Sequence, residues 1–308
     1  MDVVVIGAGI VGLTTAYELA DAGHRVDVIS RDDPYETVSG VAGGLWFPYH
    51  AAPRELIHGW GLAALDRFVA LAAHPDTGVR IARGVMAESD PDPWWREGLT
   101  GVREATPQER PAHAPFAFVA HLPLVTTTIH LAWILARLAE KGVRARRGEV
   151  RSLAEAPAAD VVVVAAGLGS ADLVPDTGLT PSRGQVVRLA NPGLADWLVD
   201  AERPDGLTYV LPHRDHVVCG GTDVEGTWDT TVDPHTEEQI LARVRSVVPA
   251  LADAPILTRA VGLRPVAPRV RLERTVIDGR DVVLNLGHGG AGVTLSWGCA
   301  AQVVSLVG

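Results

Sequence analysis

The sequence contains few cysteines, few aromatic residues and no excess of basic ones. Its 308 residues include 2 Cys and 5% Phe, Trp and Tyr, and 27 Lys and Arg stand against 37 Asp and Glu, for a formal net charge of −10. Cys219 and Cys299 lie far apart without the spacing of zinc ligands, so we expect two buried, reduced thiols and no metal site. The acidic balance, without a dense cluster of Lys and Arg, argues against nucleic acid as a partner.

Long hydrophobic runs are also missing. No apolar run approaches the ~20 residues that cross a bilayer, and the N-terminus is acidic at Asp2, where a signal peptide would be basic. We therefore expect a cytoplasmic protein with no membrane partner. The length and the 47% hydrophobic residues predict roughly two domains with packed cores, which excludes a disordered chain.

The strongest motif lies in the first thirty residues. Residues 3–6 form a short apolar run typical of a strand buried on both faces, and Gly7, Gly9 and Gly12 follow it directly as GxGxxG. A helical pattern comes next, and residues 26–29 predict a second strand. Gly7 allows the tight turn, Gly9 lets backbone N–H groups approach a pyrophosphate, and Gly12 lets the helix pack on the strand. This unit predicts dinucleotide binding.

The acidic residue that usually ends the second strand of such a unit is displaced here. Ser30 occupies the expected position, and Arg31 and Asp32 follow it, with Asp32 about 20 residues after Gly12. We interpret Arg31 and Asp32 as contacts to the adenosine part of the cofactor. The alternative is a solvated pair of surface charges.

A second glycine-rich turn lies at the far end of the chain. A helix predicted over 128–141 and an apolar strand over 160–167 extend the first sheet, and the strand over 282–286 runs into a glycine-rich turn before an apolar helix over 295–306. A purely structural turn is the alternative, but two anion-binding turns favour FAD over NAD. Alternating short strands after Gln185 indicate an antiparallel sheet.

The predicted fold class is α/β with two interleaved domains. We expect a Rossmann-like FAD-binding domain from residues 1–48, 123–185 and 258–308. The second domain, residues 49–122 and 186–257, would be an α+β substrate-binding domain on an antiparallel or mixed sheet, and its first segment is rich in Pro-containing loops.

Six further segments resemble the D-amino-acid oxidase family of glutathione-reductase-like flavoproteins. They are Ala-Gly-Gly-Leu-Trp-Phe-Pro-Tyr ending at Tyr49, Arg-Gly-Gln from 183, Tyr-Val-Leu-Pro from 209, Gly-Leu-Arg-Pro from 262, His-Gly-Gly from 288 and Trp-Gly-Cys-Ala from 297. Together with residues 4–9 they spread the resemblance over nearly the whole chain.

The resemblance implies roles for individual residues. Arg264 would bind the substrate carboxylate through its planar guanidinium, Tyr209 would add a phenolic hydrogen bond, and the Gly290 carbonyl would accept from the substrate amine. The alternatives are a surface charge for Arg264 and half-buried core for Tyr209; Trp46 could lie in the core or face the flavin. Matching positions give the cofactor contacts Gly7, Ala8, Gly9, Ile10, Val11, Gly12, Arg31, Asp32, Ser39, Gly44, Leu45, Val150, Arg264, Gly289, Gly290, Gly292, Val293 and Thr294.

The implied reaction is oxidative deamination of mainly neutral D-amino acids. Hydride passes from the substrate Cα to N5 of non-covalently bound FAD and the electrons pass to O₂, so we nominate no general base. D-Aspartate oxidase and glycine oxidase stay open, with Arg54, Arg214 and His213 as possible cations for an acidic side chain. A quinone-linked dehydrogenase and a non-catalytic flavin-binding protein are less favoured, and a homodimer is possible.

Two departures from the family pattern affect the substrate pocket. The segment before Tyr209 is too short for the lid tyrosine of the mammalian enzymes, so we expect more open access. Phe47 replaces a polar residue, which predicts a more apolar wall.

Overall fold

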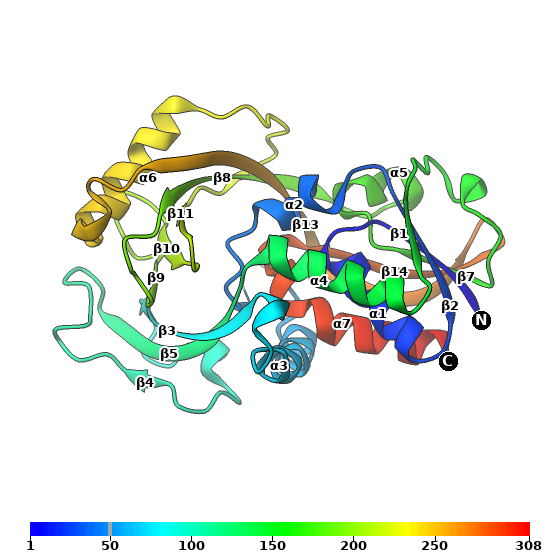
Figure 1. The fold of residues 1–308 in the computed structure, drawn as a ribbon, viewed down its shortest axis with the longest axis horizontal. Coiled ribbons are helices and arrows are strands. Elements are labelled where there is room, and N and C mark those ends of the chain that lie inside the picture. Colours follow the sequence, from blue (N-terminus) through cyan, green and yellow to red (C-terminus); the bar gives the residue numbers. More distant parts are fainter. Residues whose placement is uncertain (49–50) are drawn as a thin grey trace.

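The computed structural model describes residues 1–48 and 51–308, so Tyr49 of the sequence motif lies outside the described residues. Within them, 14 strands form one mixed sheet flanked by helices (Figure 1). The strands are β1 (Asp2–Ile6), β2 (Arg25–Ser30), β3 (Val79–Glu88), β4 (Arg103–Glu104), β5 (Phe116–Val125), β6 (Arg144–Arg147), β7 (Val161–Val164), β8 (Thr180–Ala190), β9 (Trp197–Asp200), β10 (Thr208–Pro212), β11 (His216–Gly220), β12 (Val224–Glu225), β13 (Ile256–Ile277) and β14 (Arg280–His288). The helices are α1 (Ile10–Asp21), α2 (Val38–Val41), α3 (Arg54–Leu71), α4 (Thr127–Glu140), α5 (Ser170–Leu173), α6 (Pro234–Val247) and α7 (Gly292–Val307).

Five parallel strands form one half of the sheet, in the order β14-β7-β1-β2-β6. Successive side chains of a strand point to opposite faces. Accordingly Val3 and Val5 pack in the core with α1, whereas Val4 and Ile6 pack in a second core on the other face. Gly23 ends the first helical unit with a φ of +91°, which glycine adopts without strain. The predicted βαβ unit, with a first strand buried on both faces, is confirmed.

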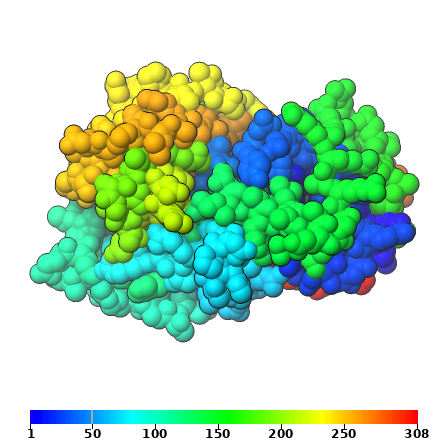
Figure 2. All heavy atoms as spheres, in the orientation of Figure 1, coloured from blue at the N-terminus to red at the C-terminus, as the bar shows by residue number. Residues whose placement is uncertain are grey.

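The other half of the sheet is mostly antiparallel and continues from the first half without a break. Strand β13 pairs with β14 on one side and with β8 on the other, and the path runs on through β11, β10, β9, β3, β5 and β4. In Figure 2 the yellow and orange residues of the β11 to α6 region lie above the cyan residues of β3. Segments far apart in the sequence therefore build this half together.

The predicted fold class is confirmed, and the structure shows how its two sheets are joined. The predicted domain boundaries at residues 122, 185 and 258 all fall inside strands, namely β5, β8 and β13. The short strands expected after Gln185 cover only part of β8, and β13, which runs from the antiparallel half to its pairing with β14 in the parallel half, was not predicted as a strand. The division into two domains stays a prediction.

Helix α7 requires a correction to the expectation about apolar length. Among the described residues, one helical stretch, Gly289–Val307, is long and apolar enough to cross a membrane by length and composition. It packs against α1 and α3, and 61% of its most apolar window is buried inside the protein. Its apolar character is that of a core helix.

Candidate active site

A long cavity of about 1160 Å³ runs between the two halves of the molecule. All five parallel strands open onto it, because the residues that follow their carboxyl ends line its wall. Ligands of open α/β sheets bind at this edge. The cavity continues to Tyr209 and Arg264 in the antiparallel half, so the predicted cofactor and substrate residues, apart from Gly12 and Thr294, line one continuous space.

The fingerprint loop is built so that only glycine fits at two of its positions. Gly7 has a φ of +115°, and a Cβ on it would lie 2.3 Å from the carbonyl oxygen of Ala165. A Cβ on Gly12 would lie 2.0 Å from the carbonyl oxygen of Gly7, so Gly12 serves the close packing of α1 and does not itself line the cavity. The residues present therefore fit a bound pyrophosphate at the start of α1.

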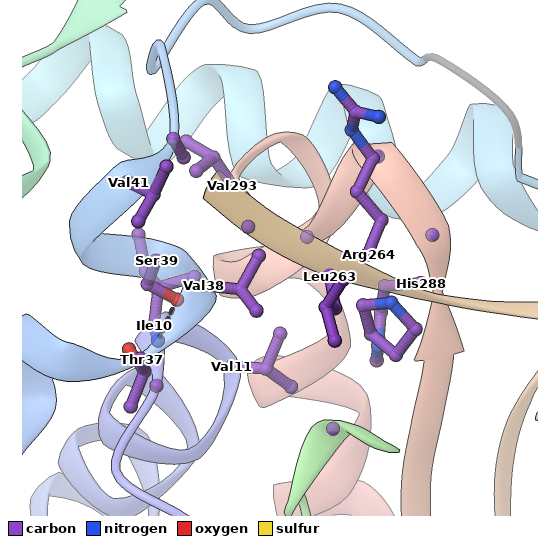
Figure 3. A pocket seen from close by; sticks show the side chains of 18 of the residues that line it. Ile10, Val11, Thr37, Val38, Ser39, Val41, Leu263, Arg264, His288 and Val293 are labelled. Atoms are coloured by element: carbon purple, nitrogen blue, oxygen red, sulfur yellow. Dashed lines mark hydrogen bonds between the residues drawn. The ribbon is translucent and has the colours of Figure 1, made fainter. Parts of the chain in front are cut away.

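Ser39 is hydrogen-bonded to the fingerprint loop. Its Oγ accepts a hydrogen bond from the backbone N–H of Ile10 at 2.9 Å (Figure 3). A Cβ on Gly9 would lie 3.2 Å from the same Oγ, which is tighter than an ordinary contact. Ser39 therefore shapes the cradle and takes up one of its N–H donors.

The predicted adenosine contacts lie together at the ends of β2 and β6. Arg31, Asp32 and Val150 all line the cavity, and the backbone N–H of Gly148 donates to the Ser30 carbonyl at 2.9 Å. Arg31 Nη2 lies 2.9 Å from Asp32 Oδ2, and this hydrogen bond lowers the pKa of the Asp32 carboxyl. Asp32 is therefore an ionised acceptor at neutral pH.

Arg264 and Tyr209 meet over strands β8 and β11, on positions where glycine makes room for them. The Arg264 guanidinium lies so close to Gly184 that a Cβ there would be 2.3 Å from Nη2. The Tyr209 ring lies over Gly220, where a Cβ would be 2.2 Å from its Cζ. Burial raises the pKa of the Tyr209 phenol and the nearby Arg264 opposes this shift, so the phenol stays a protonated hydrogen-bond donor.

Asp223 is a member of the site that the sequence did not indicate. Arg264 Nη1 donates to the Thr222 carbonyl at 3.0 Å and lies 3.4 Å from Asp223 Oδ1, while Ser182 donates to the same carboxylate oxygen. Only 16% of the Arg264 side chain is exposed. In Figure 3, Arg264 and Leu263 leave β13 on opposite sides, and Leu263 points towards Val11. Nη1 is thereby fixed, and Arg264 lines the cavity beside Tyr209.

The C-terminal glycine turn completes the cavity wall. Gly289, Gly290, Gly292 and Val293 line it between β14 and α7, as do Gly44 and Leu45 from the first segment. Burial lowers the pKa of the neighbouring His288 to about 4, so this imidazole is neutral. The turn therefore offers backbone groups and a small apolar surface, and no fixed positive charge, next to Gly290.

Thr294, Phe47 and Trp46 form contacts within the protein that the sequence did not predict. Thr294 does not line the cavity; its Oγ1 accepts from the Phe47 N–H at 2.9 Å and donates to the Phe47 carbonyl at 2.7 Å. These two hydrogen bonds hold Phe47 in the cavity wall, where the sequence predicted an apolar residue. Trp46 is 2% exposed and donates to the Gly61 carbonyl at 3.2 Å, which makes it a core residue.

Both cysteines are buried thiols, as predicted. Burial raises the pKa of the Cys219 thiol to about 12 and raises the pKa of Cys299 as well. Neither thiol is a reactive thiolate at neutral pH.

Fold and site together define a flavin-dependent oxidoreductase. The model of the family described as FAD dependent oxidoreductase matches residues 2–306, so the chain belongs to this family and FAD is its cofactor. It is 43% identical over 312 residues to a D-amino-acid oxidase of Rubrobacter xylanophilus, covering 99% of this chain and 95% of the relative. It is 44% identical over 311 residues to a D-amino-acid oxidase of Streptomyces coelicolor, covering 99% and 96%. A crystal structure of glycine oxidase from Geobacillus kaustophilus has the same fold, with a TM-score of 0.84 at 20% identity over 99% of this chain and 94% of that one.

Replacing Gly9 with valine is expected to weaken FAD binding. The added Cβ would crowd Ser39 Oγ, and its methyl groups would hold the backbone N–H groups away from a pyrophosphate. Titration of the apoprotein with FAD, followed by flavin fluorescence, measures the change. Gly59→Val is the matched control, because Gly59 is exposed on α3 and a Cβ there meets nothing within 4 Å. Equal FAD affinity of the two variants would contradict the assigned role of Gly9.

Proposed function

We propose that the protein is a D-amino-acid oxidase. It converts a D-amino acid, O₂ and water into the 2-oxo acid, ammonia and H₂O₂. The observation that carries this proposal is the meeting of Arg264 and Tyr209, from separate strands, in the cavity that also holds both glycine turns. The relatives at 43% and 44% identity support it.

The residues of the site mainly orient the substrate. Arg264 binds the carboxylate in a planar, charge-assisted contact, and the Tyr209 phenol donates to the same group. The Gly290 carbonyl oxygen accepts a hydrogen bond from an N–H of the substrate amine. FAD held at the two glycine turns would supply the hydride acceptor for the substrate Cα–H and the route by which the electrons reach O₂. Because these contacts fix the carboxylate and the amine, one enantiomer presents its Cα–H to the cofactor and the other presents its side chain. Orientation therefore supplies most of the catalysis.

The segment before Tyr209, where the mammalian enzymes carry a lid, contributes to the cavity lining. Leu207 lines the cavity just before Tyr209, and the exposed Trp228 stands at its rim with 63% of its surface accessible. We infer that substrate exchange proceeds without the mammalian lid tyrosine.

Peroxide release tests the proposed function. The purified, FAD-loaded protein is mixed with D-alanine or a larger neutral D-amino acid, and H₂O₂ is measured together with anaerobic bleaching of the flavin absorbance. Both signals are expected with the D-enantiomers and not with the L-enantiomers. Bleaching by D-amino acids without peroxide in air would instead favour the quinone-linked dehydrogenase, and no bleaching would favour a non-catalytic flavin protein.

The flavin is expected to be bound without a covalent link. Both cysteines are buried away from the cavity lining, and burial raises the pKa of each thiol, so neither offers a thiolate to a flavin. His288 lies in the glycine turn that the family resemblance implies is used without a covalent link. Acid or heat denaturation should therefore release intact FAD into the supernatant. Flavin that stays with the precipitated polypeptide would contradict this expectation.

The cytoplasmic location, the absence of nucleic-acid and membrane partners and the homodimer belong to the proposal. The cysteine content supports the cytoplasmic location, and the acidic charge balance supports the absence of a nucleic-acid partner. Light scattering behind a size-exclusion column checks the homodimer.

A further inference from the structure

The substrate half of the cavity has a wall formed by one face of strands β3, β9 and β10. Met86 pairs with Val199, and Val199 pairs with Tyr209, so the three residues share a row across the sheet. Residues of one row, and residues two positions along a strand, point to the same face. Glu88 therefore lies on the same face as Tyr209, about 7 Å further along β3 than Met86. Met86, Glu88, Val199 and Tyr209 all line the cavity.

The wall between Tyr209 and Glu88 is apolar. Met86 is 2% exposed, Val199 is half-buried, and Trp95 closes the same region from the loop before β4. We name the space lined by Met86, Trp95, Val199 and Glu88 the side-chain chamber. It has the layout that suits a long aliphatic stem, with the Glu88 carboxylate at its far end and Asp90 also in the cavity wall.

The Glu88 carboxylate is held in place and partly buried. Its Oε1 accepts a hydrogen bond from Trp95 Nε1 at 2.6 Å. Burial raises the pKa of Glu88, the Trp95 hydrogen bond opposes this shift, and the neighbouring carboxylates Glu202 and Asp90 add to it. In residues 1–48 and 51–308, Glu88 forms no ion pair with a Lys or Arg side chain. A cation entering the chamber would therefore stabilise a carboxylate that its surroundings disfavour.

The positive charges of the described cavity wall lie elsewhere. Arg31 and Arg151 are at the adenosine end, and Arg264 is the carboxylate anchor. The cations considered for an acidic substrate, Arg54, Arg214 and His213, do not line the cavity. Arg54 pairs with Glu97, and His213 contacts the Gly43 carbonyl at 3.0 Å. Among the described residues, nothing in the chamber compensates a second substrate carboxylate.

We propose that Glu88 is a specificity-determining residue that makes the side-chain chamber favour D-amino acids with a long cationic side chain, of the D-lysine and D-arginine class, over acidic ones. The proposal rests on the proposed function, because it places the substrate carboxylate at Arg264 and Tyr209. The aliphatic stem contacts Met86, Val199 and Trp95, and the terminal ammonium or guanidinium forms a charge-assisted hydrogen bond with Glu88. A terminal carboxylate at the same place is repelled.

Substrate pairs of similar shape and different side-chain charge test this assignment. We compare kcat/KM for D-lysine with its near-isosteric neutral partner D-norleucine, and for D-glutamate with D-glutamine, in the wild type and in Glu88→Gln. The glutamine keeps an oxygen acceptor for Trp95 Nε1, so the chamber keeps its shape. Loss of the charge should lower kcat/KM for D-lysine by about tenfold or more, leave D-norleucine within about twofold to threefold, and raise D-glutamate relative to D-glutamine.

Glu104→Gln is the matched control, because Glu104 is exposed on β4 and does not line the cavity. It should leave all four values unchanged. If both proteins oxidise D-norleucine and the ratio of kcat/KM for D-lysine to that for D-norleucine is the same in the wild type and in Glu88→Gln, the role of Glu88 is wrong. The proposed function would then remain intact. Failure of all four substrates to reduce the wild-type flavin would overturn the proposed function, and the role of Glu88 with it.

Discussion

Replacing Arg264 with alanine is expected to leave FAD bound while kcat/KM for neutral D-amino acids falls by about 10²–10³-fold or more. A carboxylate that enters an apolar cavity needs a paired, hydrogen-bonded partner, and truncation removes it. The structure adds a second cost, because the variant leaves Asp223 beside the incoming carboxylate without the guanidinium that lies 3.4 Å from it. The flavin should stay, since the Arg264 side chain points away from Val11 at the start of α1 (Figure 3).

Two further variants grade this effect. Arg264→Lys should recover only part of the activity, because an ammonium cannot contact both carboxylate oxygens in one plane. Tyr209→Phe removes one hydrogen bond to a charged group and should cost about 1.5–3 kcal/mol. Steady-state kinetics on D-alanine and a larger neutral D-amino acid, at matched flavin content, measure all three variants. If Arg264→Ala stays within a few-fold of the wild type on both substrates, the assigned substrate orientation is wrong.

Gly184→Ala is expected to lower kcat/KM by about 10²-fold with little change in thermal stability. The new Cβ would lie 2.3 Å from Arg264 Nη2, so the guanidinium must move. The atom that moves is the end of a flexible side chain, and the backbone of β8 has no need to shift. A displacement of about 1 Å at a substrate-orienting group is enough for a loss of this size.

Gly59→Ala is the control for that experiment, because a Cβ on Gly59 meets nothing within 4 Å. It should keep wild-type kinetics and a wild-type melting temperature. Wild-type kinetics in Gly184→Ala would show that the guanidinium position is not critical. A large drop in its melting temperature would show that Gly184 serves the packing of β8 instead.

Local sequence signals predicted the parallel half of the fold well. The apolar run before Gly7 is β1, and the helix expected over 128–141 is α4 (Thr127–Glu140). Each of these elements is decided by residues close together in the chain: a buried strand by its continuous apolar run, and a helix by its spacing. Their bounds therefore follow from the sequence to within a few residues.

Helix α3 lies in the segment that the sequence suggested to be rich in loops. Its buried residues recur at helical spacing, but Gly61 and Ala64 stand where larger apolar residues would mark the pattern. Helix α6 begins with Asp233 as N-cap and Pro234 in its first turn, a start signal that was present and not used. The 22-residue strand β13 contains Pro265 and Pro268, which read as strand breakers when neighbouring strands are unknown.

The candidate site divides in the same way. The fingerprint glycines were predictable because a local backbone conformation requires them, and Arg264 and Tyr209 came from short motifs. Asp223 and Glu88 could not be found in this manner. Asp223 reaches Arg264 only because β12 pairs with β8 and β8 pairs with β13. Glu88 shares a sheet face with Tyr209 only through the register of three strands. Such residues become visible only once the sheet is assembled.

Strand β13 also decides how the molecule can be taken apart. One continuous backbone forms hydrogen bonds to β14 in the parallel half and to β8 in the antiparallel half. Cutting the chain near residue 258 or 185 would leave a strand with an unpaired edge in each piece, and such edges associate or aggregate. We therefore expect separately expressed halves to associate or aggregate, and we expect FAD bound in the cavity that both halves line to stabilise both of them.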